Sequence, residues 1–205
     1  MSSNNFNIAN LNLDDNQPTI DNKFKVLKRL GYGSFSIVYL VENIQNNNEK
    51  LALKALNHGS NRKANSPTVC DFENEINILL QVNHQNIVKV IDKNIYEGVI
   101  TQAQKVQKII YITMEYYELG EITNYIKKGL PVKIARFFFR QLIFAVENIH
   151  MLNIAHRDIK SPNIVLDKNL TLKLVDFGMA SEIKNSLGEN ILFKNIKGTK
   201  CCMIR

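Results

Sequence analysis

The sequence contains no tryptophan, four prolines and three cysteines among its 205 residues. The cysteines are Cys70, Cys201 and Cys202, an odd set without metal-ligand spacing whose adjacent pair would form a strained disulfide. No stretch approaches the roughly 18 continuous apolar residues of a membrane-spanning helix, and the Asn-rich N-terminus lacks the apolar core of a secretory signal. We therefore expect an intracellular protein, cytoplasmic or nuclear, without a membrane partner.

The charge has one prevailing sign, because 26 Lys and Arg outnumber 19 Asp and Glu and give a net charge of +7. A basic chain can bind nucleic acid, but these lysines are scattered and form no basic stripe interleaved with aromatic residues. The pattern favours a solvated surface, which also suits an anionic ligand, over a nucleic-acid partner. A hydrophobic fraction of 45% provides a core for one or two globular units. Nothing in the pattern indicates the oligomeric state.

The first part of the chain has mainly strand character. Residues 1–22 are Asn-rich and aperiodic, which predicts a disordered leader. Residues 23–117 predict five strands and one helix. The helix is expected over 71–82, where apolar residues recur at helical spacing and Asp71 is available as its cap. The expected strands are FKVLKRLGYGSFSIVYLVEN (24–43, two strands around a Gly-rich turn), LALKAL (51–56), NIVKVIDKNIYEG (86–98) and KIIYITMEYY (108–117).

The second part, residues 118–205, is mainly helical. A short helix is expected to end at Gly129, and residues 131–152 are apolar nearly all round, which predicts a long and deeply buried helix that starts at Pro131. Short strands are expected around NIVL (163–166) and LKLVDFG (172–178). A mainly β part followed by a mainly helical part indicates an α+β fold with two lobes and a cleft between them.

The stretch LGYGSFSIVYL (30–40) contains two glycines that a phosphate-binding turn requires. A dinucleotide-binding turn would open a helix here, whereas Ile37, Val38 and Tyr39 continue as a strand. A Gly-rich hairpin can instead fold its backbone N–H groups over phosphates, with Gly31 and Gly33 permitting close approach. An ordinary hairpin turn is the alternative that this motif alone leaves open.

A lysine, Lys54, stands between apolar neighbours in LALKAL. Burial of an unpaired ammonium group is very costly, so we expect it to meet an anion. Glu75 on the predicted helix is the candidate partner, because Glu73 would point to a different face of that helix. An exposed surface lysine is the alternative interpretation.

Five polar residues interrupt an apolar run in AHRDIKSPNIVLD (155–167). Asp158 can accept a hydroxyl proton and Lys160 can neutralise a transferring phosphoryl group. Asn163 and Asp176 can offer hard oxygen ligands to Mg²⁺. This set supplies the positioning and charge stabilisation that phosphoryl transfer needs.

Taken in order, these motifs resemble the catalytic domain of eukaryotic-type protein kinases, of the serine/threonine class. The resemblance implies ATP and Mg²⁺ as cofactors, a protein substrate with a Ser or Thr hydroxyl, and an N-lobe with a five-stranded sheet and one helix. It implies that Asp158, Lys160 and Asn163 are catalytic, and that Asn163 and Asp176 hold the metal. The implied nucleotide-binding residues are Leu30, Gly31, Gly33, Val38, Ala52, Lys54, Glu75, Met114, Glu115, Tyr117 and Asp176, with Met114 as gatekeeper and 115–117 as hinge.

The sequence departs from this family at its end. GTKCCMIR (198–205) retains Gly198 and Thr199 but stops where an APE motif should begin, so the resemblance implies a partial C-lobe, a domain truncated before that motif. The helix over 131–152 would then lose packing partners. Two functions stay open: an active serine/threonine kinase, or a catalytically incompetent nucleotide-binding or regulatory fragment. Arg157 could pair with a phosphate on Ser181, Ser186 or Thr199.

Overall fold

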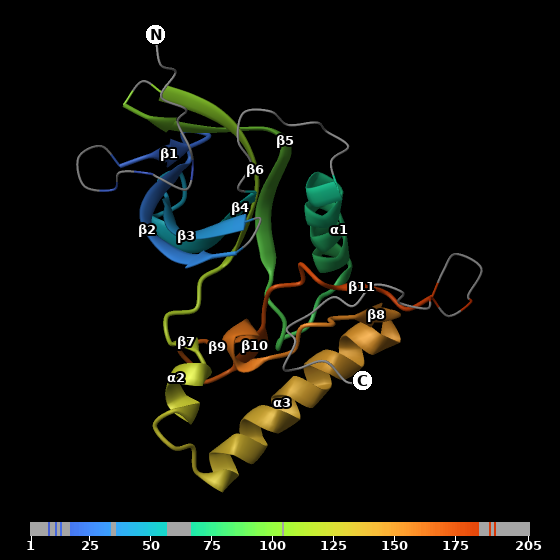
Figure 1. The fold of residues 1–205 in the computed structure, drawn as a ribbon. Helices are drawn as coiled ribbons and strands as arrows, with labels where there is room; N and C mark the ends of the chain where they lie inside the picture. The colour runs from blue at the N-terminus through green and yellow to red at the C-terminus, as the bar shows by residue number, and fades with distance from the viewer. Residues whose placement is uncertain are drawn as a thin grey trace. The chain divides into compact units, whose positions relative to one another are not determined.

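The computed structural model describes residues 8, 11, 13, 17–33, 36–56, 67–103, 105–184, 189 and 191 (Figure 1). The chain divides into two compact units. Unit 1 comprises Met1–Glu73 and Val90–Tyr116, and unit 2 comprises Asn74–Lys89 and Tyr117–Arg205. These units differ from the predicted lobes because residues 74–89, which were expected in the first lobe, belong to unit 2.

Unit 1 is a closed antiparallel barrel with the strand order β1-β2-β3-β4-β6-β5. Its strands are β1 (Thr19–Ile20), β2 (Phe24–Tyr32), β3 (Ser36–Asn43), β4 (Glu49–Leu56), β5 (Val90–Gln102) and β6 (Lys105–Glu115). The five predicted strands are therefore present as β2 to β6. Closure by a sixth strand was not predicted.

The sixth strand, β1, comes from the segment that the sequence predicted to be a disordered leader. Thr19 and Ile20 pair with β2 on one side and with β5 on the other. Ile8, from the same segment, is fully buried. The prediction was wrong for these residues, because the two-residue strand is defined by long-range pairing with β5 that local composition does not reveal.

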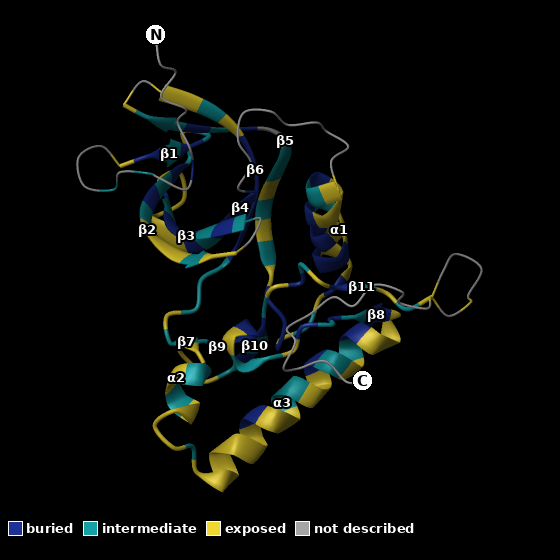
Figure 2. Cartoon of the chain, in the orientation of Figure 1, coloured by how far each residue is buried: buried dark blue, intermediate teal, exposed yellow. Residues whose placement is uncertain are grey.

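The core of unit 1 fills the inside of the barrel. Alternation along the strands sends one set of side chains inward, including Tyr39 on β3, Leu53 on β4 and Tyr111 on β6. The ring of Phe24 packs edge-on against that of Tyr111, with centroids 5.9 Å apart. Figure 2 shows this burial on the strands of the barrel. Each large side chain buried here contributes about 1.5–3 kcal/mol to stability.

Helix α1 spans Pro67–Gln81 and begins earlier than predicted. Proline is tolerated in the first turn of a helix, so Pro67 starts α1 and Asp71 lies within it instead of capping it. The predicted apolar spacing is confirmed for Phe72, Ile76 and Leu79, which are buried, but not for Leu80, which belongs to the same predicted set and is 50% exposed.

In the part of the chain that the structure describes, unit 2 combines the C-terminal part of α1, from Asn74 onward, with helices α2 and α3 and with short strands. Helix α2 (Thr123–Ile126) is the short helix predicted before Gly129, and this glycine has a left-handed φ of 85°. The hairpin of β9 (Ile164–Leu166) and β10 (Leu172–Leu174) is extended by β7 (Gly120–Glu121). A second small sheet pairs β8 (Ile154–Ala155) with β11 (Ser181–Glu182). The single-turn helix η2 (Ser161–Asn163) precedes β9.

Helix α3 (Val132–Met151) has the predicted length but is not deeply buried. Its buried residues are Phe138, Ala145 and Ile149, which form one narrow stripe. Most of the other apolar side chains are exposed, as the yellow surface of α3 in Figure 2 shows. The composition indicated the apolar character correctly, but burial also requires packing partners. Among the residues that the structure describes, no helix is both long and apolar enough to cross a membrane.

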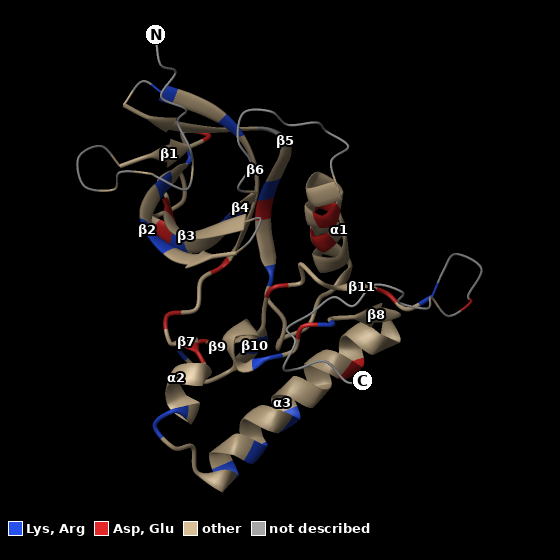
Figure 3. Cartoon of the chain, viewed as in Figure 1, with Lys and Arg blue, Asp and Glu red and all other residues tan. Residues whose placement is uncertain are grey.

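Charged side chains of both signs are distributed over the strands of unit 1 (Figure 3). The N-terminal half of α3 is basic, with Lys133, Arg136 and Arg140. These three cations alternate with exposed apolar residues.

Candidate active site

In unit 1, the register of the sheet places the predicted nucleotide-binding residues on one face. Val38 lies opposite Lys54, and Ala52 lies opposite Met114. Directly opposed residues share a face of the sheet, and residues two apart on one strand do so too. Val38, Ala52, Lys54 and Met114 therefore line the outer face of the barrel wall, whose inner face carries Tyr39 and Leu53.

The Gly-rich turn joins β2 to β3. Leu30 forms a bulge, because Arg29 pairs with Tyr39 and Gly31 pairs with Val38. Among the described atoms, none lies within 4 Å of the position that a Cβ on Gly31 would occupy, whereas Gly33 approaches Ser36. The fold therefore does not require a glycine at position 31. Close approach by a ligand would require one.

Lys54 and Glu75 are both buried, with 7% and 3% of their surface exposed. Lys54 lies on β4, and Glu75 lies on α1 in the part assigned to unit 2. Glu73, the glutamate that the sequence analysis set aside, is half-buried. Burial of these charges excludes the surface-lysine alternative for Lys54. The pairing of Lys54 with Glu75 stays a prediction.

The residues of the predicted hinge do not share one environment. Met114 is buried at the end of β6. Glu115 pairs with Leu51, so it lies on the face of β6 opposite to Met114. The ring of Tyr117, in unit 2, contacts the ammonium group of Lys173, with Nζ 5.4 Å from the ring centroid.

In unit 2, the structure brings the three predicted catalytic residues together. The carboxylate of Asp158 is buried, and its Oδ2 is 2.8 Å from Nζ of Lys160. The Nδ2 of Asn163 donates to the same Oδ2 at 3.0 Å and to the backbone oxygen of Asp158 at 2.9 Å. Two donors on one oxygen fix the orientation of the carboxylate.

Short strands hold these residues in place. Asn163 ends η2 directly before β9, and its backbone oxygen accepts a hydrogen bond from Val175 N at 2.9 Å. Val175 follows β10 and precedes Asp176. The β9–β10 hairpin therefore positions Asn163 and Asp176 at the same end of two paired strands.

His156 links this loop to the segment of Asp176 and Phe177. Its Nε2 lies 3.1 Å from Val175 O, and its Nδ1 accepts a bond from Asp158 N at 3.3 Å. This pattern defines a neutral imidazole protonated at Nε2. Burial lowers the pKa of His156. The hydrogen bond to Val175 O and the carboxylates of Asp176 and Asp158 raise this pKa, but burial has the larger effect.

Two residues of the site have left-handed backbone conformations that favour glycine. Arg157 has a φ of 66° and Asp176 a φ of 60°. Each such residue costs about 1–2 kcal/mol, and such strain gathers at functional sites. The side chain of Arg157 donates from Nη1 to the Ser181 hydroxyl at 2.9 Å. Ser186 and Thr199, the other hydroxyls predicted near Arg157, lie outside the described residues.

The predicted metal site fits magnesium by the chemistry of its donors. Among the described residues, no group of three or more His, Cys, Asp or Glu could hold a metal ion. Magnesium is commonly bound by one or two protein oxygens together with substrate phosphates and water. The Nδ2 of Asn163 donates to Asp158, so the amide oxygen of Asn163 is the atom that would bind a cation. The carboxylate of Asp176 would be the second protein ligand.

Comparison with known proteins gives the family. Residues 24–203 match the protein kinase domain. The chain therefore belongs to the protein kinase family, as its motifs predicted. Its fold is a partial form of the protein-kinase fold.

Several of the similar proteins are serine/threonine-protein kinases by name. CBL-interacting serine/threonine-protein kinase 12 of Arabidopsis thaliana is 36% identical over 184 residues, which are 89% of this chain and 35% of that protein. The corresponding kinase 19 of the same plant is 35% identical, with 90% and 36% covered. A serine/threonine-protein kinase of Debaryomyces hansenii is 33% identical, with 77% and 26% covered. The chain spans about a third of the length of the first two relatives.

Sequence reasoning missed a polar contact that supports the site. Nδ2 of Asn86 donates to Gln141 Oε1 at 2.8 Å and to Leu172 O at 2.9 Å, and Leu172 N donates to the same Oε1 at 2.9 Å. These bonds tie α3 to β10, shortly before Val175. The available signal was Gln141 itself, an uncharged polar residue directly before the apolar run 142–146 of α3.

Proposed function

We propose that this protein is an ATP-dependent serine/threonine kinase that transfers the γ-phosphate of Mg-ATP to a protein hydroxyl. The constellation of Asp158, Lys160 and Asn163 around one carboxylate oxygen is the observation that carries this proposal. Membership of the protein kinase family and the names of the relatives support it. The protein substrate is proposed only as a chemical class, a Ser or Thr hydroxyl.

In the proposed reaction, the hydroxyl oxygen of the substrate bonds to the γ-phosphorus of ATP. The bond between that phosphorus and the β–γ bridging oxygen breaks, and ADP leaves. Asp158 orients the hydroxyl and accepts its proton, while Lys160 compensates charge on the transferred group. Lys54 is proposed to bind the α- and β-phosphates and to pair with Glu75.

Magnesium would supply charge neutralisation at the phosphates. Asn163 and Asp176 are the residues proposed to hold it. The backbone around Gly31 and Gly33 would cover the phosphates, and Val38, Ala52 and Met114 would form an apolar surface for the base of the nucleotide.

The test is transfer of labelled phosphate from Mg-ATP to peptides that carry Ser, Thr or Tyr as their sole hydroxyl. We expect transfer to the Ser and Thr peptides, and a loss of about 10²–10⁴-fold in Asp158→Asn with Mg-ADP affinity retained. The matched control is Asp167→Asn, in the turn after β9, which keeps an acceptor for the backbone bonds made by Asp167. Mg-ADP binding without transfer to any peptide would support the alternative of an incompetent regulatory fragment.

A further inference from the structure

A segment outside the matched kinase domain completes the barrel of unit 1. We define the N-terminal arm as Ile8, Leu11, Leu13 and residues 17–22; the matched domain starts at Phe24. Thr19 of the arm pairs with Lys25 of β2 and with Thr101 of β5. Without β1, these strands would be the edges of an open sheet. The arm thus joins the β2–β3 hairpin, which carries the Gly-rich turn, to the β5–β6 hairpin, which ends beyond Met114.

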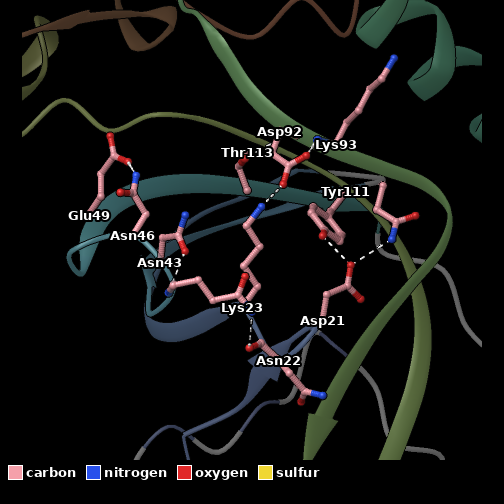
Figure 4. Close-up of polar contacts among 12 residues, drawn as sticks. Asp21, Asn22, Lys23, Asn43, Asn46, Glu49, Asp92, Lys93, Tyr111 and Thr113 are labelled. Carbon is pink, nitrogen blue, oxygen red and sulfur yellow. Dashed lines mark hydrogen bonds and ion pairs between the residues drawn. The ribbon is translucent and has the colours of Figure 1, made fainter.

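The side chain of Asp21 attaches the arm to the β5–β6 hairpin by accepting three hydrogen bonds. Its Oδ1 accepts from Val99 N at 2.6 Å, and its Oδ2 accepts from Asn94 Nδ2 at 2.9 Å. The Tyr111 hydroxyl donates to the same Oδ2 at 2.6 Å, as Figure 4 shows. Burial is the largest cause that raises the pKa of Tyr111, and the hydrogen bond to Asp21 is the next largest. The hydroxyl therefore stays protonated and can donate to Asp21. Asp21 has a φ of 50°, a conformation that Asp tolerates better than most residues.

An ion pair adds a second attachment beside Asp21. Lys23 pairs with the Oδ2 of Asp92 on β5, as Figure 4 shows. Asp92 also accepts a bond from Thr113 of β6 at its backbone oxygen. The turn between β1 and β2 is therefore attached to both strands of the β5–β6 hairpin.

Tyr39 attaches the arm to the other hairpin. It is 1% exposed, and its hydroxyl donates to the backbone oxygen of Ile8 within the barrel. Ile8 is part of the buried core cluster, and Leu11 and Leu13 pack against it. Because Tyr39 neighbours Val38, the arm contacts β3 from behind the face that carries the predicted nucleotide-binding residues.

The pairing within the Gly-rich hairpin of β2 and β3 is irregular. Register shifts interrupt the pairing of β2 with β3 twice, at Leu27 and Leu30. Leu30 and Tyr32, near its tip, are 40% and 61% exposed. Because bulges bend the strand that carries them, the angle of the hairpin depends on the sheet to which it is joined.

We propose that Asp21 and Tyr39 are positioning residues for nucleotide binding. Through these two residues the arm fixes the β2–β3 hairpin against β4. The Gly-rich turn and Lys54 then already have the positions in which they bind the phosphates. Binding to a preorganised site avoids the cost of ordering the hairpin, which raises affinity. This inference rests on the proposed function, because it takes Mg-ATP and Mg-ADP as the ligands of that face.

The test compares Mg-ADP affinity in the 205-residue chain and in its variants Tyr39→Phe and Asp21→Asn. We expect each variant to weaken binding by about threefold to tenfold, which corresponds to one net hydrogen bond. The KM for ATP should rise by the same factor while kcat is unchanged. The control is Ile109→Val, a core substitution in the same barrel that leaves the bonds of the arm in place. When Ile109→Val lowers the melting temperature about as much as the arm variants do, it should change the Mg-ADP affinity by less than about twofold.

A second variant asks whether the polarity of the contacts around Asp21 matters. In Asp21→Asn, an amide NH₂ faces the donors Asn94 and Tyr111. Adding Asn94→Asp supplies an acceptor for that NH₂, so the double variant should recover Mg-ADP affinity. Equal weakening in Ile109→Val and the arm variants, or wild-type affinity in both arm variants, would overturn the proposal.

Hydrogen exchange separates this inference from the proposed function. In the ligand-free protein, Asp21→Asn should accelerate exchange in the β2–β3 hairpin and leave the β9–β10 hairpin of unit 2 unchanged. If the wild-type chain binds no Mg-ADP, the proposed function fails, and the exchange result then decides on the arm alone. Unchanged exchange in the β2–β3 hairpin would contradict its role in positioning.

Discussion

The ring of Phe177 packs against the ring of His156, with centroids 4.6 Å apart and an interplanar angle of 65°. Phe177 is fully buried, so the imidazole lies against an apolar surface. An imidazolium at this position would lose hydration. Its protonated Nδ1 would also repel the backbone N–H of Asp158, which donates a hydrogen bond to Nδ1 in the neutral form. The neutral form of His156 is therefore part of the folded state.

This contact predicts a loss of stability in mild acid. The pKa of His156 lies below its ordinary value of 6.5 because of burial, so the unfolded state binds the proton more readily than the folded state. The contribution of the neutral ring is complete above about pH 6.5 and decreases as the pH falls below that value. We expect urea unfolding to show lower stability at about pH 5.5 than at about pH 7.5.

Imidazole NMR signals identify the residue responsible. The pKa of His84 shifts in the same direction, through burial and then the nearby charge of Lys173, so the unfolding curves alone do not separate the two histidines. Each ring should be titrated separately in the folded protein. A pKa of His156 at or above its ordinary value of 6.5 would contradict the prediction.

Substitution by alanine should affect two glycines of unit 1 differently: one substitution should lower stability, and the other should lower nucleotide affinity. A Cβ at Gly98 would lie 2.7 Å from Ile109 O and 2.9 Å from the ring of Tyr111, so the backbone must shift. We expect Gly98→Ala to lower the free energy of unfolding by about 1–3 kcal/mol. Urea unfolding followed by circular dichroism measures this difference.

Gly31→Ala provides the matched comparison. No described atom lies within 4 Å of its added methyl group, so stability should change by about 0.5 kcal/mol or less. Mg-ADP affinity should fall, because the methyl group fills the position that a phosphate would approach. Wild-type affinity in Gly31→Ala, measured by calorimetry, would rule out close contact between this glycine and the ligand.

Sequence reasoning found the parts of the site that depend on local order. Asp158, Lys160 and Asn163 lie close together in the sequence, so a single loop brings them into contact, and β9 and β10 follow from short apolar runs. Family resemblance supplied what local order could not, such as the proposal that Lys54 and Asp158 act in one reaction.

The errors arose where the outcome depends on distant partners. The arm has few apolar residues, and they do not recur at the spacing of a helix or a strand. Its strand forms because Thr19 and Ile20 pair with Thr101 and Ile100 of β5, which are distant in the sequence. The burial of α3 was overestimated for a related reason. An apolar helix is buried only to the extent that other elements cover it, and composition does not count those elements.

The contact between Gln141 and Leu172 predicts a specific cost of removing one acceptor. Gln141→Leu keeps the approximate size of the side chain but removes the acceptor of Leu172 N and of Asn86 Nδ2. Loss of a partner for buried donors costs about 1–3 kcal/mol. The measurement is the free energy of unfolding, with Gln85→Leu at an exposed glutamine as the control. Equal effects in the two variants would show that Gln141 does not anchor β10.

Two adjacent phenylalanines of α3 test how the helix is packed. Phe138 is 4% exposed and Phe139 is 62% exposed, although both belong to the same apolar run. We expect Phe138→Ala to lower the free energy of unfolding by about 3–5 kcal/mol, since it leaves a cavity. Phe139→Ala should change it by about 0.5 kcal/mol or less and reduce binding of a hydrophobic dye, because it removes apolar surface from water. If the two substitutions cost the same, Phe139 is covered in solution, and the exposed face of α3 is then a contact surface.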